Sequence, residues 1–519
     1  MNLMEHLAIL VVITPLFGAF ATPFVSLGGR KVSDIWASLM SGLAFVFSIL
    51  LLSQVLNSGV VIYTLGAPDP AVATVEHRGL IFPVRILLEV DALSALLALI
   101  ISLIAFLASI YSWRYMEHDT GIEKFYTLYL LLLTGMLGLV LTGDIFNMYV
   151  FLEIMSISAY ALVAFRKETF EAVEAGIKYL VVGSAASTMI LLAVAILYGV
   201  YGSLTIAQLA HLIKASPSPL IWGALALYLT GFIMKAGIVP LHMWLIDAHP
   251  AAPSSISALL SGVVIKTGAY AIIRILFTLY GIEVMNRELI GWLIVIIAVI
   301  TMFVGGSLGL IQQDLKRLLA YSSVSQMGYI ALGVGIALIA FNQTAGDVGL
   351  IGALFHLFNH AIMKGMLFLI SGVILHQIGT RNINEMGGLI RKMPVTSFCF
   401  IVGGLAIAGV PPFNGFVSKL ILYEASAMIS PALAVIAVIS SALTLGMYLK
   451  VIQTAFLGRV PEELEDVRDP PASMLVPIVL LTVLIIIFGI LPALPIDSVI
   501  LPAVEAVKAQ SSYISAVLP

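Results

Sequence analysis

The sequence is dominated by apolar runs such as Leu220-Ile-Trp-Gly-Ala-Leu-Ala-Leu-Tyr-Leu-Thr-Gly-Phe-Ile-Met-Lys235-Ala-Gly-Ile-Val-Pro240. A helix needs about 20 predominantly apolar residues to cross the hydrocarbon core of a bilayer. The segment 219–245 is long enough, and Lys235 is its only lysine, arginine or acidic residue. It therefore predicts a membrane-spanning helix that carries one buried charge and is interrupted near its proline.

Similar apolar runs fill most of the 519 residues, which are 61% hydrophobic and only 10% charged, with a mean hydropathy of +1.10. Soluble domains are about 25% charged, so a water-soluble enzyme is excluded. The sequence predicts an all-α polytopic membrane protein with about fourteen transmembrane helices. These are expected near 3–26, 34–56, 91–111, 123–143, 145–165, 174–199, 219–245, 254–280, 289–311, 318–340, 349–376, 395–428, 432–457 and 473–494.

Two whole-chain properties narrow the function. The net charge of −3 gives no reason to expect a nucleic-acid partner. The single cysteine, Cys399, excludes disulfide frameworks, Cys-ligated zinc and iron–sulfur clusters, which need several thiolates. We expect no cofactor and no bound metal.

The basic residues between the predicted helices predict the orientation. Thirteen fall on one side: Arg30, Lys31, Arg114, Lys124, Arg166, Lys167, Lys316, Arg317, Arg381, Arg391, Lys392, Arg459 and Arg468. Five fall on the other: Arg78, Arg85, Lys214, Arg287 and Lys508. Because basic loops stay in the cytoplasm, we expect both termini outside the plasma membrane of a prokaryote.

The two halves of the chain look related. Residues 123–280 and 289–457 each contain a proline-interrupted helix followed by a helix with a further lysine. Units of five helices have opposite orientations in the membrane, and broken helices at matching places indicate a transporter site. Residues 1–122 are then three N-terminal helices, and 458–519 are a loop and the last helix.

Seven basic residues fall inside apolar segments, namely Lys178, Lys235, Lys266, Arg274, Lys364, Lys419 and Lys450. A lysine at the bilayer centre costs about 2.5–3.5 kcal/mol, so such residues need a partner or water. Lys235, Lys266 and Lys419 are the deepest. Structural pairing in the bundle is the simplest alternative for each, and it is more plausible for Lys178, Lys364 and Arg274.

Glu153, midway along 145–165, is the clearest partner, and we predict that it pairs with Lys235. Such a pair is a two-state switch. While the carboxylate is close, the lysine keeps its proton, and when the pair opens, burial favours the neutral amine and the proton leaves. In the second half, Pro411 and Pro412 are expected to free the carbonyls of Ile407 and Ala408 before Lys419.

The histidines permit more than one interpretation. His356 and His360 lie one helical turn apart, on one face with Lys364, and histidine relays protons near neutral pH. They are otherwise core histidines, and a metal or haem role is disfavoured because no further ligand is evident.

Four other polar residues lie near helix ends. His242 and His249 flank the end of the first broken helix, where a structural or a gating role is equally plausible. Asp91 and Asp144 are expected to be interfacial helix caps.

Several motifs together resemble the antiporter-like proton-translocating subunits of complex I and of Mrp-type sodium/proton antiporters. They are the segments 235–270, beginning Lys-Ala-Gly-Ile-Val-Pro-Leu-His, 314–328 (Asp-Leu-Lys-Arg-Leu-Leu-Ala-Tyr-Ser-Ser-Val-Ser-Gln-Met-Gly), 360–368 (His-Ala-Ile-Met-Lys-Gly-Met-Leu-Phe) and 409–419 (Gly-Val-Pro-Pro-Phe-Asn-Gly-Phe-Val-Ser-Lys). The chain is most similar to the Mrp-D type and its counterpart in archaeal membrane-bound hydrogenase or ferredoxin-linked complexes. Little chain follows the last predicted helix, unlike the larger members with a lateral helix.

The resemblance implies fourteen helices with two inverted five-helix repeats and discontinuous helices seven and twelve. It also implies a proton pathway made of Glu153, Lys235, Lys266, His356, His360 and Lys419. We therefore expect a proton-translocating subunit, with or without sodium exchange and without a catalytic centre of its own, whose partners are other membrane subunits. A haem- or quinone-binding redox subunit and a non-pumping scaffold are the alternatives.

Overall fold

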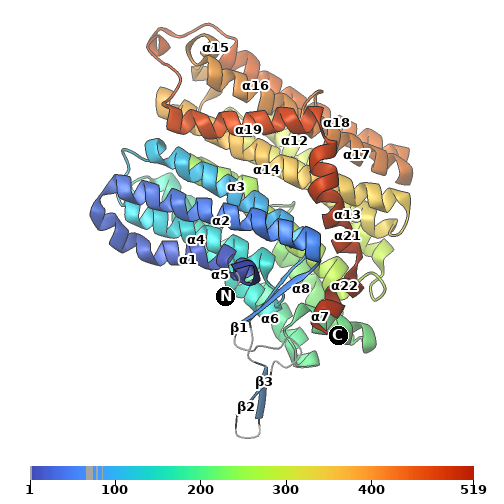
Figure 1. Ribbon diagram of the computed structural model, residues 1–519. Helices are drawn as coiled ribbons and strands as arrows, with labels where there is room; N and C mark the ends of the chain where they lie inside the picture. Colours follow the sequence, from blue (N-terminus) through green and yellow to red (C-terminus); the bar gives the residue numbers. More distant parts are fainter. Residues whose placement is uncertain (1–2, 66–73, 78–79, 84–85, 519) are drawn as a thin grey trace.

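The computed structural model of this chain describes residues 3–65, 74–77, 80–83 and 86–518. Long helices run side by side through the molecule, and both ends of the chain lie at the same end of the bundle (Figure 1). Within lipid no water is present to bind backbone N–H and C=O groups. A helix satisfies these groups within its own segment, which is why the apolar runs of this chain form helices.

The helices of the first half begin and end as follows: α1 (Leu7–Val25), α2 (Arg30–Ser58), α3 (Ala92–Tyr115), α4 (Ile122–Leu141), α5 (Ile145–Val163), α6 (Phe170–Tyr201), α7 (Ile206–Ala215), α8 (Leu220–Lys235), α9 (Met243–Ala251), α10 (Ser254–Leu259) and α11 (Ile265–Ile273). A π-helical turn at Leu260–Val264 joins α10 to α11, and a second at Arg274–Tyr280 extends α11, so that Ser254–Tyr280 is one continuous helix.

The helices of the second half are α12 (Arg287–Ile311), α13 (Leu315–Ile339), α14 (Thr344–Ile378), α15 (Leu389–Lys392), α16 (Pro394–Ala408), α17 (Asn414–Ile429), α18 (Pro431–Val451), α19 (Ala472–Ile490), α20 (Ala493–Pro495), α21 (Leu501–Lys508) and α22 (Gln510–Val517). In the described part of the chain, twelve helices are long and apolar enough to cross a membrane. The prediction of a polytopic helical membrane protein is thereby confirmed.

The helices differ in how far the rest of the protein encloses them. The most apolar part of Ser254–Tyr280 is entirely buried, and that of α13 is 89% buried. The corresponding parts of α18 and α19 are only 33% buried, so most of their apolar side chains face outward. Ser254–Tyr280 and α13 therefore lie at the centre of the bundle, with α14 packed against both, and a charged side chain there is shielded from lipid.

The seventh and twelfth predicted spans are each divided into two helices, α8 with α9 and α16 with α17. Both first helices end with a glycine in the left-handed region, Gly237 at φ 66° and Gly409 at φ 83°. Ile238 N–H donates to the carbonyl of Ile233 at 3.1 Å, and Val410 N–H donates to that of Leu405 at 3.0 Å. This is the Schellman arrangement, so glycine ends each helix before its proline is reached.

Several elements were not predicted from the sequence. Strands β1 (Val61–Leu65) and β4 (Ile86–Val90) pair antiparallel with Val61 opposite Val90, and β2 (Thr74–His77) pairs with β3 (Leu80–Pro83). After α19 the chain continues through α20, a π-helical turn at Ile496–Ile500, α21 and α22, which cross to α3, α14 and α7 (Figure 1). The sequence predicted only a loop and one helix in 458–519, so these short helices after α19 were not expected.

Polar contacts join the loops that were predicted to share one side. Arg166 Nε lies 2.9 Å from Asp119 Oδ1, and Arg381 Nη2 lies 2.9 Å from Glu171 Oε2. Arg30 donates to the Glu117 carbonyl at 2.6 Å. These contacts connect the ends of α2, α3, α5, α6 and α14, so the loops lie at one end of the bundle.

At the opposite end, Lys214 contacts Glu283 at 2.6 Å and Lys508 contacts Asp347 at 2.5 Å. Arg78 and Arg85, which were counted for that side, lie outside the described residues.

Candidate functional site

Of the seven basic residues predicted inside apolar segments, five are buried in the bundle, each 4% exposed or less. They are Lys235, Lys266, Arg274, Lys364 and Lys419.

The other two predicted members are not buried. The Lys178 side chain is 50% exposed and forms ion pairs with Glu174 at 2.9 Å and Asp247 at 3.0 Å, because it lies near the end of α6. Lys450 is partly buried at the end of α18, where it donates to the carbonyls of Leu310 and Gln312.

Lys235, the last residue of α8, is held by hydroxyl groups of α5. Its Nζ donates to Ser156 Oγ at 2.8 Å and to Tyr160 Oη at 3.1 Å. The predicted direct pair with Glu153 is not formed within 4 Å, and the ammonium group donates to these two hydroxyls instead. Glu153 lies on the same helix, three residues before Ser156, and its Oε1 is buried without a hydrogen-bond partner among the described residues.

Lys266 lies on α11 beside the break after α8. Its Nζ donates to the carbonyl of Ser261, inside the π-helical turn that precedes α11. Gly268, two residues further on, approaches the break closely, since a Cβ atom there would lie 2.7 Å from Ala236 N. The absence of a side chain at Gly268 therefore brings the helix of Lys266 against the residue that follows Lys235.

The histidines of α14 lie between Lys266 and the second broken helix. His356 Nδ1 lies 3.0 Å from Ser418 Oγ, and its Nε2 lies 3.1 Å from Gln326 Oε1. The rings of His356 and His360 are parallel, with centroids 5.9 Å apart. Within the described residues, neither nitrogen of His360 has a hydrogen-bond partner, although the residue is fully buried.

Lys419 lies on α17, the second helix of the other broken pair. Its Nζ donates to the Ile407 carbonyl at 2.8 Å and to Ser441 Oγ at 3.0 Å. Ser441 in turn donates to the Ala408 carbonyl at 2.8 Å. The prediction that the break frees the carbonyls of Ile407 and Ala408 is confirmed, because side chains bind both.

Lys364 and Lys316 extend the buried polar region toward the end that holds Arg166 and Arg381. Lys364 Nζ donates to the Leu319 carbonyl at 2.8 Å and to Tyr448 Oη at 3.1 Å. Lys316 was counted among the basic residues of the loops, but it belongs to α13, is 1% exposed and donates to the Ala252 carbonyl at 2.8 Å. It lies at the start of α13, where hydropathy alone does not separate a loop from the first turn of a helix.

The remaining candidates have structural contacts. Asp91 and Asp144 cap α3 and α5 as predicted, accepting from Ser94 N at 2.9 Å and Asn147 N at 2.7 Å. Asp91 also binds Arg274 through two bonds of 2.7 Å.

The two histidines near the first break are both buried. The His249 ring stacks on Phe368 with the centroids 4.4 Å apart. His242 precedes α9 and has no hydrogen-bonded ring nitrogen among the described residues.

Neutral side chains that contact the lysines and histidines were not predicted from the sequence. They are Ser156, Tyr160, Gln326, Ser418, Ser441 and Tyr448. Serine and tyrosine are common in apolar helices, so only their positions relative to the lysines identify them. In the described part of the chain, none of Lys235, Lys266, Lys364 and Lys419 forms an ion pair within 4 Å.

These contacts favour proton exchange over permanent charge. A buried ammonium group without an acid is costly, whereas a neutral amine hydrogen-bonded to hydroxyls and carbonyls is tolerated. Amines and imidazoles that are close to one another can pass a proton along when water bridges the remaining gaps. The arrangement can therefore take up, hold and release protons along the bundle centre.

The chain matches two known protein families. Residues 142–444 match the family described as NADH:quinone oxidoreductase/Mrp antiporter, TM, and residues 80–126 match that described as NADH-Ubiquinone oxidoreductase (complex I), chain 5 N-terminus. The chain is 35% identical to the N subunit of the NADH-quinone oxidoreductase of Desulforudis audaxviator, over 95% of this chain and 98% of that protein. It is 32% identical to the D subunit of the Na(+)/H(+) antiporter of Alkalihalophilus pseudofirmus, over 84% and 86% of the two chains.

A solved structure has the same fold. It is a chain of the membrane-bound sulfane sulfur reductase, an archaeal respiratory membrane complex, with a TM-score of 0.88, 32% identity and coverage of 98% and 99% of the two chains. Other relatives are longer, and this chain spans 62% or 63% of their length.

Proposed function

The chain belongs to the NADH:quinone oxidoreductase/Mrp antiporter transmembrane family, and on that basis we propose that it moves protons along the line from Lys235 to Lys419. It is an antiporter-like membrane subunit of the kind found in Mrp and complex I-like assemblies. We propose which residues form the path, that the ion moved is the proton, and that Glu153 controls its release from Lys235. The proton path consists of Glu153, Lys235, Lys266, His356, His360 and Lys419.

One observation carries the proposal: the buried lysines of the described residues are held by neutral oxygens and not by acids. Lys266 is the central case, since it is 0% exposed and its ammonium donates to the Ser261 carbonyl. At the bilayer centre a permanently charged lysine would cost about 2.5–3.5 kcal/mol. A lysine that alternates between charged and neutral forms avoids that cost for part of each cycle.

Glu153 supplies the control in this proposal. When its carboxylate moves toward Lys235 in place of Ser156 and Tyr160, the ammonium form is stabilised. When it moves away, Lys235 loses its proton to Lys266 through bridging water. His360 and His356 then carry the proton toward Ser418, and Lys419 receives it.

The surrounding assembly and orientation also belong to the proposal. We infer that 123–280 and 289–457 form two inverted repeats, that both termini lie outside the plasma membrane of a prokaryote, and that other membrane subunits flank the chain. The family includes both antiporters and redox complexes. Proton movement through this chain serves either, with or without sodium exchange.

Replacement of Lys266 tests the proposal most directly. In the assembled complex in proteoliposomes, Lys266→Ala is expected to reduce proton movement at least about 100-fold, as loss of a proton-transfer group does. Lys178→Ala, at an exposed ion pair, is the matched control and should leave proton movement unchanged. Unchanged movement in Lys266→Ala, with the complex intact, would instead support a non-pumping scaffold. A Soret absorption band from the purified chain would support the haem-binding alternative.

A further inference from the structure

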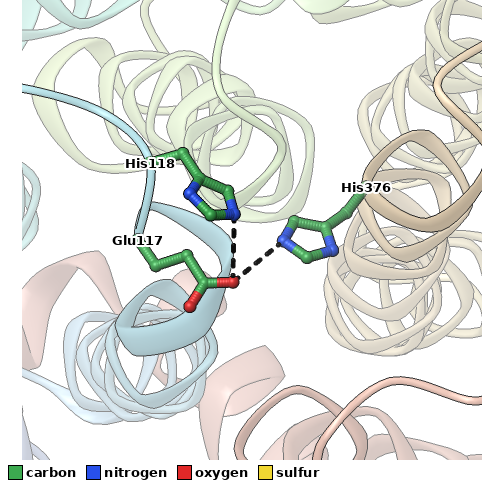
Figure 2. A group of neighbouring side chains, drawn as sticks. All are labelled: Glu117, His118 and His376. Atoms are coloured by element: carbon green, nitrogen blue, oxygen red, sulfur yellow. Dashed lines mark ion pairs between the residues drawn. The ribbon is translucent and has the colours of Figure 1, made fainter.

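Three metal-ligating side chains meet away from the proton path, where the ends of α3 and α14 lie together (Figure 2). Glu117 and His118 follow α3, and His376 lies in the last turn of α14. Glu117 Oε1 lies 3.4 Å from His118 Nε2 and 3.6 Å from His376 Nε2. One ligand atom from each residue lies within 4.8 Å of the others.

These spacings suit a small tetrahedral cation. Zinc bonds to histidine nitrogen and carboxylate oxygen at about 2.0–2.2 Å, so its ligand atoms lie about 3.3–3.5 Å apart. The two distances from Glu117 Oε1 are already close to that range. His118 is 83% exposed, so its ring can move, whereas Glu117 and His376 are each only 19% exposed. Two anchored ligands and one movable ligand give an ion a route in from solvent.

The neighbouring charges leave the ligand atoms available. Arg114 pairs with the other carboxylate oxygen of Glu117, Oε2, so Oε1 faces the two imidazoles. Arg30 donates to the main-chain carbonyl of Glu117 and not to its carboxylate.

The histidine rings are also free to bind. Among the described residues, both ring nitrogens of His376 are buried and lack a hydrogen-bond partner. Its ring lies nearly parallel to that of His118, at 16° with the centroids 6.2 Å apart. Buried nitrogens without partners are the groups that a metal ion would satisfy.

We propose that Glu117, His118 and His376 bind a zinc ion, with water as the fourth ligand. Two histidines and one carboxylate are a ligand set typical of zinc sites that retain an open position. The bound ion would tie α3 to α14, the helix that carries His356, His360 and Lys364. Resting on the proposed function, we further expect zinc to slow proton movement by restraining α14.

Cobalt(II) serves as a spectroscopic probe for the zinc site. The experiment uses the untagged full-length chain in detergent, because a polyhistidine tag would bind the same metals. Cobalt is expected to give the intense visible absorption of a tetrahedral site at one equivalent, and zinc should displace it. His376→Gln and Glu117→Gln should each weaken binding at least about tenfold, since even partners outside the ligand shell change affinity 10–100-fold.

His211→Gln is the matched control, because His211 is an exposed histidine of α7 at the opposite end of the bundle. It should leave cobalt binding unchanged. Equal binding by the wild type and by a His118→Gln/His376→Gln double variant would overturn the site. Thermal unfolding of the variants without metal shows whether the fold is intact.

A second measurement separates the zinc site from the proton path. In proteoliposomes, micromolar zinc should slow proton movement in the wild type and have no effect in His376→Gln. If zinc binds but leaves proton movement unchanged, the proposed restraint of α14 is wrong. If no proton movement occurs at all, the proposed function is wrong, and the cobalt spectrum still decides whether the site exists.

Discussion

The two broken helices have the same cap but hold their lysines in opposite ways. Lys235 lies before its break, on α8, and Lys419 lies after its break, on α17. Lys235 is bound by the hydroxyls of Ser156 and Tyr160, on the helix that also carries Glu153. Lys419 is instead bound by the carbonyl of Ile407, which the break itself exposes, and by Ser441.

The same glycine cap at the break therefore accompanies two different lysine environments. In the first half, the proposed movement of the Glu153 carboxylate would change the charge of Lys235. In the second half, the oriented carbonyl cannot move away, so Lys419 has a fixed environment. In the proposed path, the protonation of Lys235 changes with the position of Glu153, whereas the surroundings of Lys419 stay the same. This difference between its two ends gives the path a direction.

The greatest loss of transport is expected from changes in the first half. Lys235→Ala and Glu153→Ala should each reduce proton movement in the assembled complex at least about 100-fold, because the proposed switch needs both charges. Proton uptake by proteoliposomes is the measurement, and assembly is checked by the recovery of the flanking subunits. Normal proton movement in either variant would show that the first half is not controlled by Glu153 and Lys235 as proposed.

A smaller effect tests the shared cap. Gly409→Ala and Gly237→Ala should each destabilise the protein by about 1–2 kcal/mol, because alanine is strained in the left-handed region. Gly409→Ala should also impair transport, since the new Cβ would lie 3.0 Å from Lys419 Cδ.

Thermal unfolding measured by tryptophan fluorescence reports the change. Gly223→Ala in α8 is the control, because no atom lies within 4 Å of the added Cβ and its stability should not fall. An unchanged melting temperature in both cap variants would mean that the left-handed cap does not contribute to stability.

The mildest changes compare the hydroxyls that hold the two lysines. Ser441→Ala should slow proton movement more than Tyr160→Phe, with both reductions between about twofold and tenfold, as expected for single hydrogen bonds. Ser441 contacts both Lys419 and the Ala408 carbonyl, whereas Tyr160 leaves Lys235 with Ser156. Transport rates in matched proteoliposomes decide the order, and the reverse order would show that Lys419 does not depend on its fixed environment.

The spans themselves were predictable because hydropathy is a local property of the chain. The prediction of 289–311 corresponds to α12 at Arg287–Ile311, and that of 318–340 to α13 at Leu315–Ile339. The elements that were missed are short or amphipathic. They include β1, α7 and the helices after α19, and their positions depend on contacts with distant parts of the chain.

Local sequence was a weaker guide to individual charges. Lys178 was assigned to the buried set and is exposed at an ion pair, whereas Lys316 was assigned to a loop and is buried. Lys316 follows Asp314 and precedes Arg317 in a polar stretch, whereas Lys178 is followed by an apolar one, so the neighbouring residues indicated the opposite of what the fold shows. Only the packing of neighbouring helices decides whether such a side chain meets water.

Hydropathy and residue type were enough to identify a helical membrane protein and to select the lysines, histidines and prolines at its centre. These inferences follow from the cost of placing charge or unpaired backbone in hydrocarbon. The contacts of those groups became known only from the folded chain. Glu153 and Lys235 are on separate helices, and so are Lys419 and Ser441. Which oxygen meets which ammonium group therefore depends on how the helices pack.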